Sequence, residues 1–152
     1  MPVTDHQLLV RGVKYSAIPV LSLEGIHDVY ITEHTMNGSL FEDFLRKYIL
    51  PIVQPFNGVN PKSVIVMDNA SIHHVEEVTG LIEAHGARLC YLPPYSPDLM
   101  PCEGIFSQVK SIIKENHTLF DICSCPRSML ALAFGMVTVE DCYGHISHCG
   151  YV

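Results

Sequence analysis

Two acidic residues, Asp68 and Glu103, are the strongest candidates for chemistry in this chain of 152 residues. Asp68 directly follows the apolar run 63–67, and Glu103 follows a proline-rich stretch, 92–101. Two carboxylates on rigid elements can hold the divalent cations that assist phosphoryl transfer, and their hard oxygen atoms favour magnesium or manganese. Either residue alone could instead serve a helix, Asp68 as an N-cap and Glu103 as a first-turn acid near the positive end of the dipole.

Alternating strands and helices are expected to bring these two carboxylates together. Residues 63–67 form an uninterrupted apolar run, which predicts a central strand buried on both faces. A helix ending at Gly86 follows, and residues 88–92 predict a second buried strand. Strands that alternate with helices are usually parallel neighbours, and their carboxyl ends form the edge where ligands bind. The sequence therefore predicts a three-layer α/β fold with Asp68 and the Glu103 loop at that edge.

The remaining elements frame this unit. Residues 14–23 and 26–33 predict a β-hairpin. A capping box at Ser39 and Glu42 then predicts the start of an amphipathic helix. Residues 1–13 are polar and predict no element. We expect one domain over residues 1–152, in which residues 126–152 form a helical tail.

The first turn of the helix that carries Glu103 opens an apolar stripe at Cys102, which continues through residue 113. Glu103 falls at the edge of this stripe, near Lys110 on the helical wheel. The carboxylate can therefore reach a strand end while the helix stays packed. The prolines before it fix their backbone φ angles and stiffen the loop.

Composition limits the class of protein. With 48% hydrophobic residues the chain predicts a globular domain, and its net charge of −7 is unusual for a DNA-binding protein. Cys90 and Cys102 lie in apolar patterns and are expected to be buried, reduced thiols of an intracellular protein. No secretory signal or membrane-spanning run is found, so we expect a soluble nuclear or cytoplasmic protein.

Four further residues are candidate nucleic-acid contacts. His73 and His74 follow Asp68 closely and could carry protons or contact phosphate, although residues at a helix start can equally be solvated. Tyr95 lies in the proline-rich loop. Lys110 could meet a phosphate or pair with Glu103 along their shared helix.

Two stretches carry a family resemblance, M-D-N-A-S-I-H-H and Y-L-P-P-Y-S-P-D-L-M-P-C-E-G-I-F-S-Q-V-K. They resemble the Tc1/mariner and IS630-type transposases of the DDE endonuclease superfamily, and the similarity extends from about Val10 to Tyr151. The resemblance implies an RNase H-like core with a mixed sheet, cleavage and joining of DNA at transposon ends and targets, and possible homo-oligomers. It also implies two magnesium or manganese ions held by three carboxylates, with Asp68 as the second acid and Glu103 as the third.

The departures from the family pattern concern the first acid. The family's first aspartate belongs on the first strand of the core, which is expected to be missing here. None of the upstream acids outside the first helix lies in the family's context for that aspartate; they are Asp5, Glu24, Asp28 and Glu33. The DNA-binding helix-turn-helix region that precedes the core in the family is likewise expected to be missing, and Met100 replaces the usual asparagine. We therefore expect a truncated catalytic core that is inactive alone.

Two alternatives stay open at this point. The chain could be a non-catalytic remnant that serves as a DNA- or protein-interaction module. It could also be an RNase H-like nuclease unrelated to transposition, which would share the carboxylate chemistry.

Overall fold

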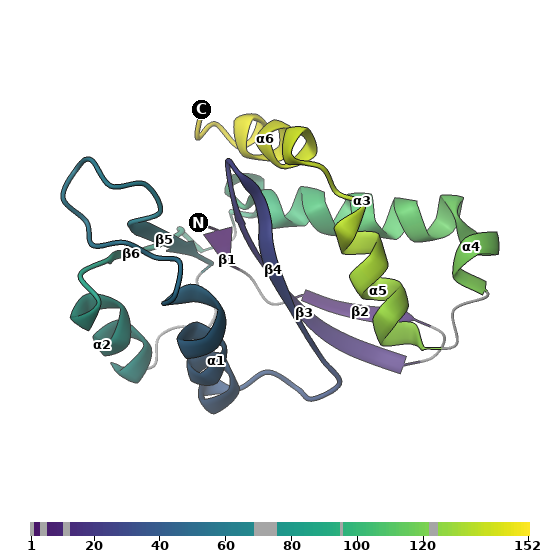
Figure 1. The fold of residues 1–152 in the computed structure, drawn as a ribbon, viewed down its shortest axis with the longest axis horizontal. Helices are drawn as coiled ribbons and strands as arrows, with labels where there is room; N and C mark the ends of the chain where they lie inside the picture. The colour runs from purple at the N-terminus through teal and green to yellow at the C-terminus, as the bar shows by residue number, and fades with distance from the viewer. Residues whose placement is uncertain (1, 4–5, 11–12, 69–75, 95, 122–124) are drawn as a thin grey trace.

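The fold consists of two small β-sheets with helices on both faces (Figure 1). The computed structural model describes residues 2–3, 6–10, 13–68, 76–94, 96–121 and 125–152. One sheet has the order β1–β5–β6 and is parallel; its strands are β1 (Pro2–Val3), β5 (Val64–Met67) and β6 (Arg88–Tyr91). The other is antiparallel, with β2 (His6–Val10), β3 (Val13–Ser22) and β4 (Gly25–Thr32). β1 also contacts β3, so the two sheets adjoin.

The place beside β5 is occupied, which corrects the expectation of a missing first strand. Pro2 lies opposite Val66 and Val3 opposite Met67 in a parallel pair. The expectation that residues 1–13 carry no element is also wrong, because β2 pairs with β3 from His6 to Val10. Hydrogen bonds to β3 define β2, and a short strand without an alternating pattern can form wherever a neighbour supplies these partners.

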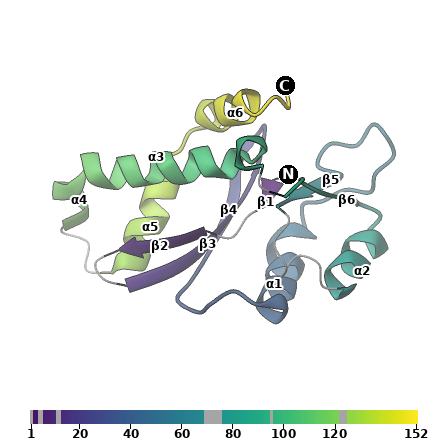
Figure 2. The same ribbon diagram turned by 180° about the vertical axis from the view of Figure 1, so that it is seen from behind.

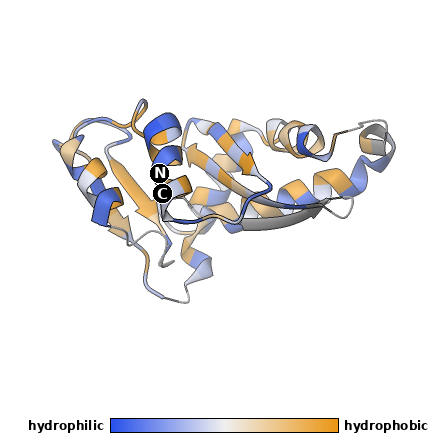
Figure 3. Ribbon diagram, turned by 90° about the horizontal axis from the view of Figure 1, so that it is seen from below, coloured by the Kyte–Doolittle hydropathy of each residue, from blue (hydrophilic) through white to orange (hydrophobic). Residues whose placement is uncertain are grey.

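Strand β3 separates two hydrophobic clusters because successive side chains of a strand point to opposite faces. Ala17 and Leu21 belong to the cluster formed with α3, α5 and α6. Ile18 and Val20 belong to the cluster formed with α1 and α2. The molecule therefore has three layers, as the sequence predicts. Residue hydropathy along the helices in Figure 3 alternates between hydrophilic and hydrophobic, as expected for helices that cover a sheet.

The helices on one face of the sheets, α1 and α2, agree only partly with the sequence prediction. Helix α1 (Gly38–Phe44) is capped by Asn37, whose side chain accepts a hydrogen bond from the Leu40 amide, so the predicted Ser39–Glu42 box is wrong. The helix continues as a π-helical turn, η1 (Leu45–Ile49). Helix α2 (Glu76–Ala84) is followed by Gly86 at φ +83°, as predicted for a glycine stop.

The helical layer on the other face is built around α3 (Pro101–Glu115), the longest helix among the described residues (Figure 2). A 3₁₀ turn, η3 (Pro97–Leu99), precedes it, and α4 (His117–Asp121) follows it. The predicted apolar stripe is confirmed, since Cys102, Ile105, Phe106 and Val109 are buried. Helices α5 (Pro126–Gly135) and α6 (Val139–His148) form the predicted helical tail and pack on α3 and β4.

Burial of the parallel sheet is lower than the sequence suggests. In β5 only Ile65 and Met67 are fully buried, and in β6 residues alternate between exposed and half-buried. Cys90 is exposed, in contrast to the buried thiol that was expected, because β6 is the edge strand. None of the helices in the described part of the chain combines the length and apolar character that crossing a bilayer requires.

Candidate functional site

Asp68 lies at the carboxyl end of β5, where the sequence predicts a ligand edge. Strands β5 and β6 are parallel neighbours, with Met67 opposite Tyr91. Asp68 is the next residue; its side chain is half-buried, and its Oδ1 atom is buried. A carboxylate fixed directly after a sheet strand has little freedom to move, which suits a ligand that must hold one geometry.

Glu103 reaches the same region through the loop after β6. Three backbone hydrogen bonds shape this loop, from Leu99 to Ser96, from Met100 to Pro97, and from the Glu103 amide to the Met100 carbonyl at 3.1 Å. Pro101 then opens α3, and Glu103 lies in the first turn with a half-buried side chain. Proline at the first helical position is already in the helical φ range, so the helix start is well defined.

The buried thiol of Cys102 is affected by the charges of both acids. Cys102 is completely buried, and burial raises the pKa of its thiol, to which the charges of Glu103 and then Asp68 add. Both carboxylates therefore lie near enough to the start of α3 for their charges to act on this thiol, although β5 and α3 lie far apart in the sequence. The raised pKa also keeps the thiol protonated, so it does not offer a soft thiolate ligand.

A cleft of about 270 Å³ lies beside Glu103, between the start of α3 and the last turn of α6. Gly104 and Ser107 line it from α3, and His145 and His148 line it from α6. The sequence predicts only a helical tail for residues 126–152, so the contribution of α6 to this cleft was missed. One local pattern does mark α6, a capping box between Thr138 and Asp141 that fixes the start of the helix.

The other predicted contacts are placed only in part. Lys110 is exposed on α3, two helical turns after Glu103, and its contact with DNA stays a prediction. His73, His74 and Tyr95 lie outside the described residues. Among the residues that the structure describes, no group of three or more histidine, cysteine, aspartate or glutamate side chains is arranged to hold a metal ion.

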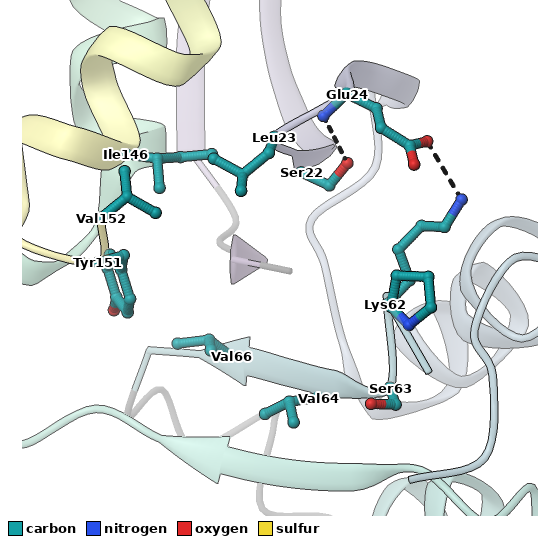
Figure 4. A pocket seen from close by; sticks show the side chains of 11 residues that line it. Ser22, Leu23, Glu24, Lys62, Ser63, Val64, Val66, Ile146, Tyr151 and Val152 are labelled. Carbon is teal, nitrogen blue, oxygen red and sulfur yellow. Dashed lines mark hydrogen bonds and ion pairs between the residues drawn. The ribbon is translucent and has the colours of Figure 1, made fainter. Parts of the chain in front are cut away.

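A second cavity, of about 460 Å³, contains neither candidate acid (Figure 4). Val64 and Val66 of β5 face Ile146, Tyr151 and Val152 across it. Its one carboxylate, that of Glu24 at the rim, forms an ion pair with Lys62 at 3.1 Å. An apolar cavity whose rim acid is already paired does not match the donor set of a metal site.

Comparison with known proteins identifies the family. A model of the DDE superfamily endonucleases matches residues 6–122, most of the chain. A search of curated proteins found no match.

Among solved structures, the catalytic domain of Mos1 mariner transposase matches with a TM-score of 0.69 at 15% identity, covering 96% of this chain and 74% of that domain. The Mos1 catalytic domain with raltegravir and manganese matches with a TM-score of 0.71 at 14% identity, covering 99% and 76%. The HTLV-2 integrase catalytic core domain in complex with magnesium matches with a TM-score of 0.61 at 12% identity, covering 90% and 82%.

At these identities the structural likeness establishes the fold, that of transposase and integrase catalytic cores, and confirms the predicted RNase H-like class. The chain spans 52% of the Mos1 transposase seen in a paired-end complex with a left transposon end. The match over residues 6–122 includes both Asp68 and Glu103. This chain belongs to the DDE superfamily endonucleases.

Proposed function

We propose that the chain is the catalytic core of a transposase-type endonuclease that cleaves and joins DNA with divalent metal ions, and that Asp68 and Glu103 hold these ions. The observation that carries the proposal is the placement of Asp68 directly after β5 and of Glu103 in the first turn of α3, within the residues that match the DDE superfamily endonucleases. The charges of both carboxylates act on the buried Cys102 thiol, which supports it.

The chemistry of the donor set fits magnesium or manganese. Asp68 and Glu103 offer hard carboxylate oxygen atoms, and the protonated Cys102 beside them adds no competing soft ligand. Two such ions, when bound, stabilise the attacking and leaving oxygen atoms of phosphoryl transfer. The protein's part is to keep the two carboxylates in one geometry, Asp68 through the β5–β6 pairing and Glu103 through the start of α3.

The family resemblance implies a third carboxylate, and the upstream acids are the candidates for it. Glu24 is paired with Lys62 at the β3–β4 turn, and Asp28 is exposed and accepts from the Val29 amide. Asp5 lies outside the described residues, between β1 and β2 in the sequence. It is the upstream acid nearest along the chain to the strand that pairs with β5, so it is the residue to test.

Metal binding is the direct test of the site. Isothermal calorimetry with Mn²⁺ should give binding that weakens about tenfold or more in Asp68→Asn and in Glu103→Gln, since each change removes a charged ligand. Glu115→Gln, an exposed change at the far end of α3, is the matched control and should leave the affinity unchanged. Equal affinities in all four proteins would overturn the proposed site.

DNA nicking then tests activity. We expect the chain alone to be inactive on DNA that carries transposon ends if Asp5 is not a ligand. Mn²⁺-dependent nicking that disappears in Asp5→Asn, Asp68→Asn and Glu103→Gln would instead establish a complete triad. Nicking that survives Asp68→Asn would contradict the proposal.

The alternative function is a non-catalytic DNA- or protein-interaction module. The absence of a three-residue ligand group among the described residues favours it. In that case DNA or protein binding would persist unchanged in Asp68→Asn and Glu103→Gln, and Mn²⁺ would not bind. DNA as the partner agrees with a nuclear or cytoplasmic location, which we also propose.

A further inference from the structure

The C-terminal segment contacts the Glu103 region at three points, of which the first is a hydrogen bond from Tyr151. The Tyr151 hydroxyl donates to the Leu99 carbonyl at 2.7 Å, across 52 positions of sequence. Leu99 is the last residue of η3, immediately before the Met100–Pro101 start of α3. Burial raises the pKa of the Tyr151 hydroxyl, and nearby thiols raise it further, so the hydroxyl keeps its proton and remains a donor.

The second contact is steric. Gly104 follows Glu103 directly, and a Cβ atom added at Gly104 would overlap the imidazole ring of His145. Gly135 of α5 and Gly144 of α6 have open space at the same position. The missing side chain at Gly104 therefore sets how closely α6 approaches the first turn of α3.

The third contact fixes the orientation of the His145 ring. Gln108 donates from Nε2 to Asp141 Oδ2 at 2.7 Å, and its Oε1 accepts from His145 Nε2 at 2.8 Å. A carboxylate only accepts hydrogen bonds, so Asp141 determines which way the Gln108 amide points and hence which ring nitrogen of His145 carries the proton. Asp141 is itself held by the capping box with Thr138.

These contacts are placed before, directly after and about one turn beyond Glu103, at residues 99, 104 and 108. Packing of α6 on α3 already buries Cys142 and Ile146, so the two helices do not need polar contacts to associate. Hydrogen bonds and a close steric fit instead restrict translation and rotation, which nonspecific apolar packing leaves less defined.

We propose that the segment from Thr138 to Tyr151 positions Glu103, with Tyr151 and His145 as its positioning residues. This inference rests on the proposed function because it assigns a metal ion to Glu103. How firmly the start of α3 is held can nevertheless be measured without metal. Neither residue touches the reacting atoms in this assignment; they act through the loop and helix that carry the carboxylate.

Tyr151→Phe is the least disruptive test, because it removes one hydroxyl and keeps the ring. Its matched control is Tyr143→Phe, which removes a hydroxyl from an exposed tyrosine on α6. The first readout is the alkylation rate of Cys102, measured by mass spectrometry without metal; this thiol is buried next to Glu103, so we expect its alkylation to accelerate when the start of α3 is held less firmly. The second readout is Mn²⁺ affinity. We expect Tyr151→Phe to accelerate Cys102 alkylation and weaken Mn²⁺ binding by about three- to tenfold, the range of one hydrogen bond.

Gly104→Ala is the second test, with Gly144→Ala as the control in open space. The added methyl group should separate α3 from α6 and accelerate Cys102 alkylation at least as much as Tyr151→Phe. Replacing His145 with alanine in the same protein should bring the rate down to that of His145→Ala alone, because the ring that the methyl group overlaps is gone.

The outcomes separate the two proposals. If the native chain binds no Mn²⁺ but Tyr151→Phe still accelerates Cys102 alkylation, the metal site is wrong and the positioning of the α3 start stands. If the native chain binds Mn²⁺ and Tyr151→Phe changes neither Cys102 alkylation nor affinity, the positioning role is overturned and the metal site stands. Equal alkylation rates in the two tyrosine variants would likewise overturn it.

Discussion

Gly104 of α3 lies against the imidazole ring of His145 in α6, with no side chain between the two helices at that point. The ring has one nitrogen in a hydrogen bond with Gln108 and the other next to the Gly104 backbone. Burial lowers the pKa of His145, and His148 lowers it further, against the opposing effect of Asp141. The helix pair is therefore built around a neutral histidine.

This neutral histidine predicts a pH dependence of stability. The folded pKa lies below the usual 6.5, so the unfolded chain binds more protons at mildly acidic pH. The contribution of His145 to stability is then complete above pH 6.5 and is lost as the pH falls through the folded pKa. Thermal unfolding from pH 7.5 to pH 5 should show a smaller acid-induced decrease in Tm in His145→Gln than in the native chain. The exposed His34→Gln serves as the control, and parallel profiles in all three proteins would contradict the prediction.

The start of α1 distinguishes two capping residues. Asn37→Ala removes the side chain that accepts from the Leu40 amide and should lower the free energy of unfolding by about 1 kcal/mol. Ser39→Ala, at the position that the sequence pattern favours, should change it by less than about 0.5 kcal/mol. Urea denaturation measures both free energies of unfolding. A larger decrease in Ser39→Ala than in Asn37→Ala would contradict Asn37 as the cap and favour the Ser39–Glu42 capping box.

The packing of α3 on α5 predicts a strong core effect. Phe106 is buried, and its ring meets that of Phe134 edge to face with centroids 6.0 Å apart. Phe106→Ala should destabilise the fold by about 3–5 kcal/mol through lost contacts and a cavity. Leu132→Ala, on the exposed side of α5, should cost less than about 0.5 kcal/mol in the same urea titration. Similar losses for the two variants would argue against this packing.

Thiol reactivity should follow exposure rather than the apolar sequence context. Hydrogen bonds from the Ser128 backbone and side chain lower the pKa of the exposed Cys125, so we expect it to react first with iodoacetamide at neutral pH. Cys90 is exposed and should follow, whereas Cys102 is buried, its pKa is raised, and it should react much more slowly than either. Peptide mass spectrometry gives the order, and early labelling of Cys102 would contradict the buried site.

Much of the fold could be predicted because it depends on local patterns. The stripe from Cys102 to Val109 predicts α3, and the run ending at Met67 predicts β5 with Asp68 directly after it. The pairing of β5 with β6 follows from the helix between them, since right-handed crossovers join parallel neighbours. The remaining elements are less local. Strand β2 is short and is defined by its hydrogen bonds to β3, and Cys90 is exposed because β6 has a neighbour on one side only.

The sequence alone determined that Asp68 follows a strand, that Glu103 opens a helix, and that both lie in a DDE-type motif. These are statements about neighbouring residues, whose conformations follow from local periodicity, proline and capping residues. Only the tertiary structure decided that the charges of both acids act on the Cys102 thiol, and that Tyr151 and His145 contact residues around the start of α3. These contacts join residues distant in the chain, and their geometry depends on how closely two packed helices approach, which no local pattern encodes.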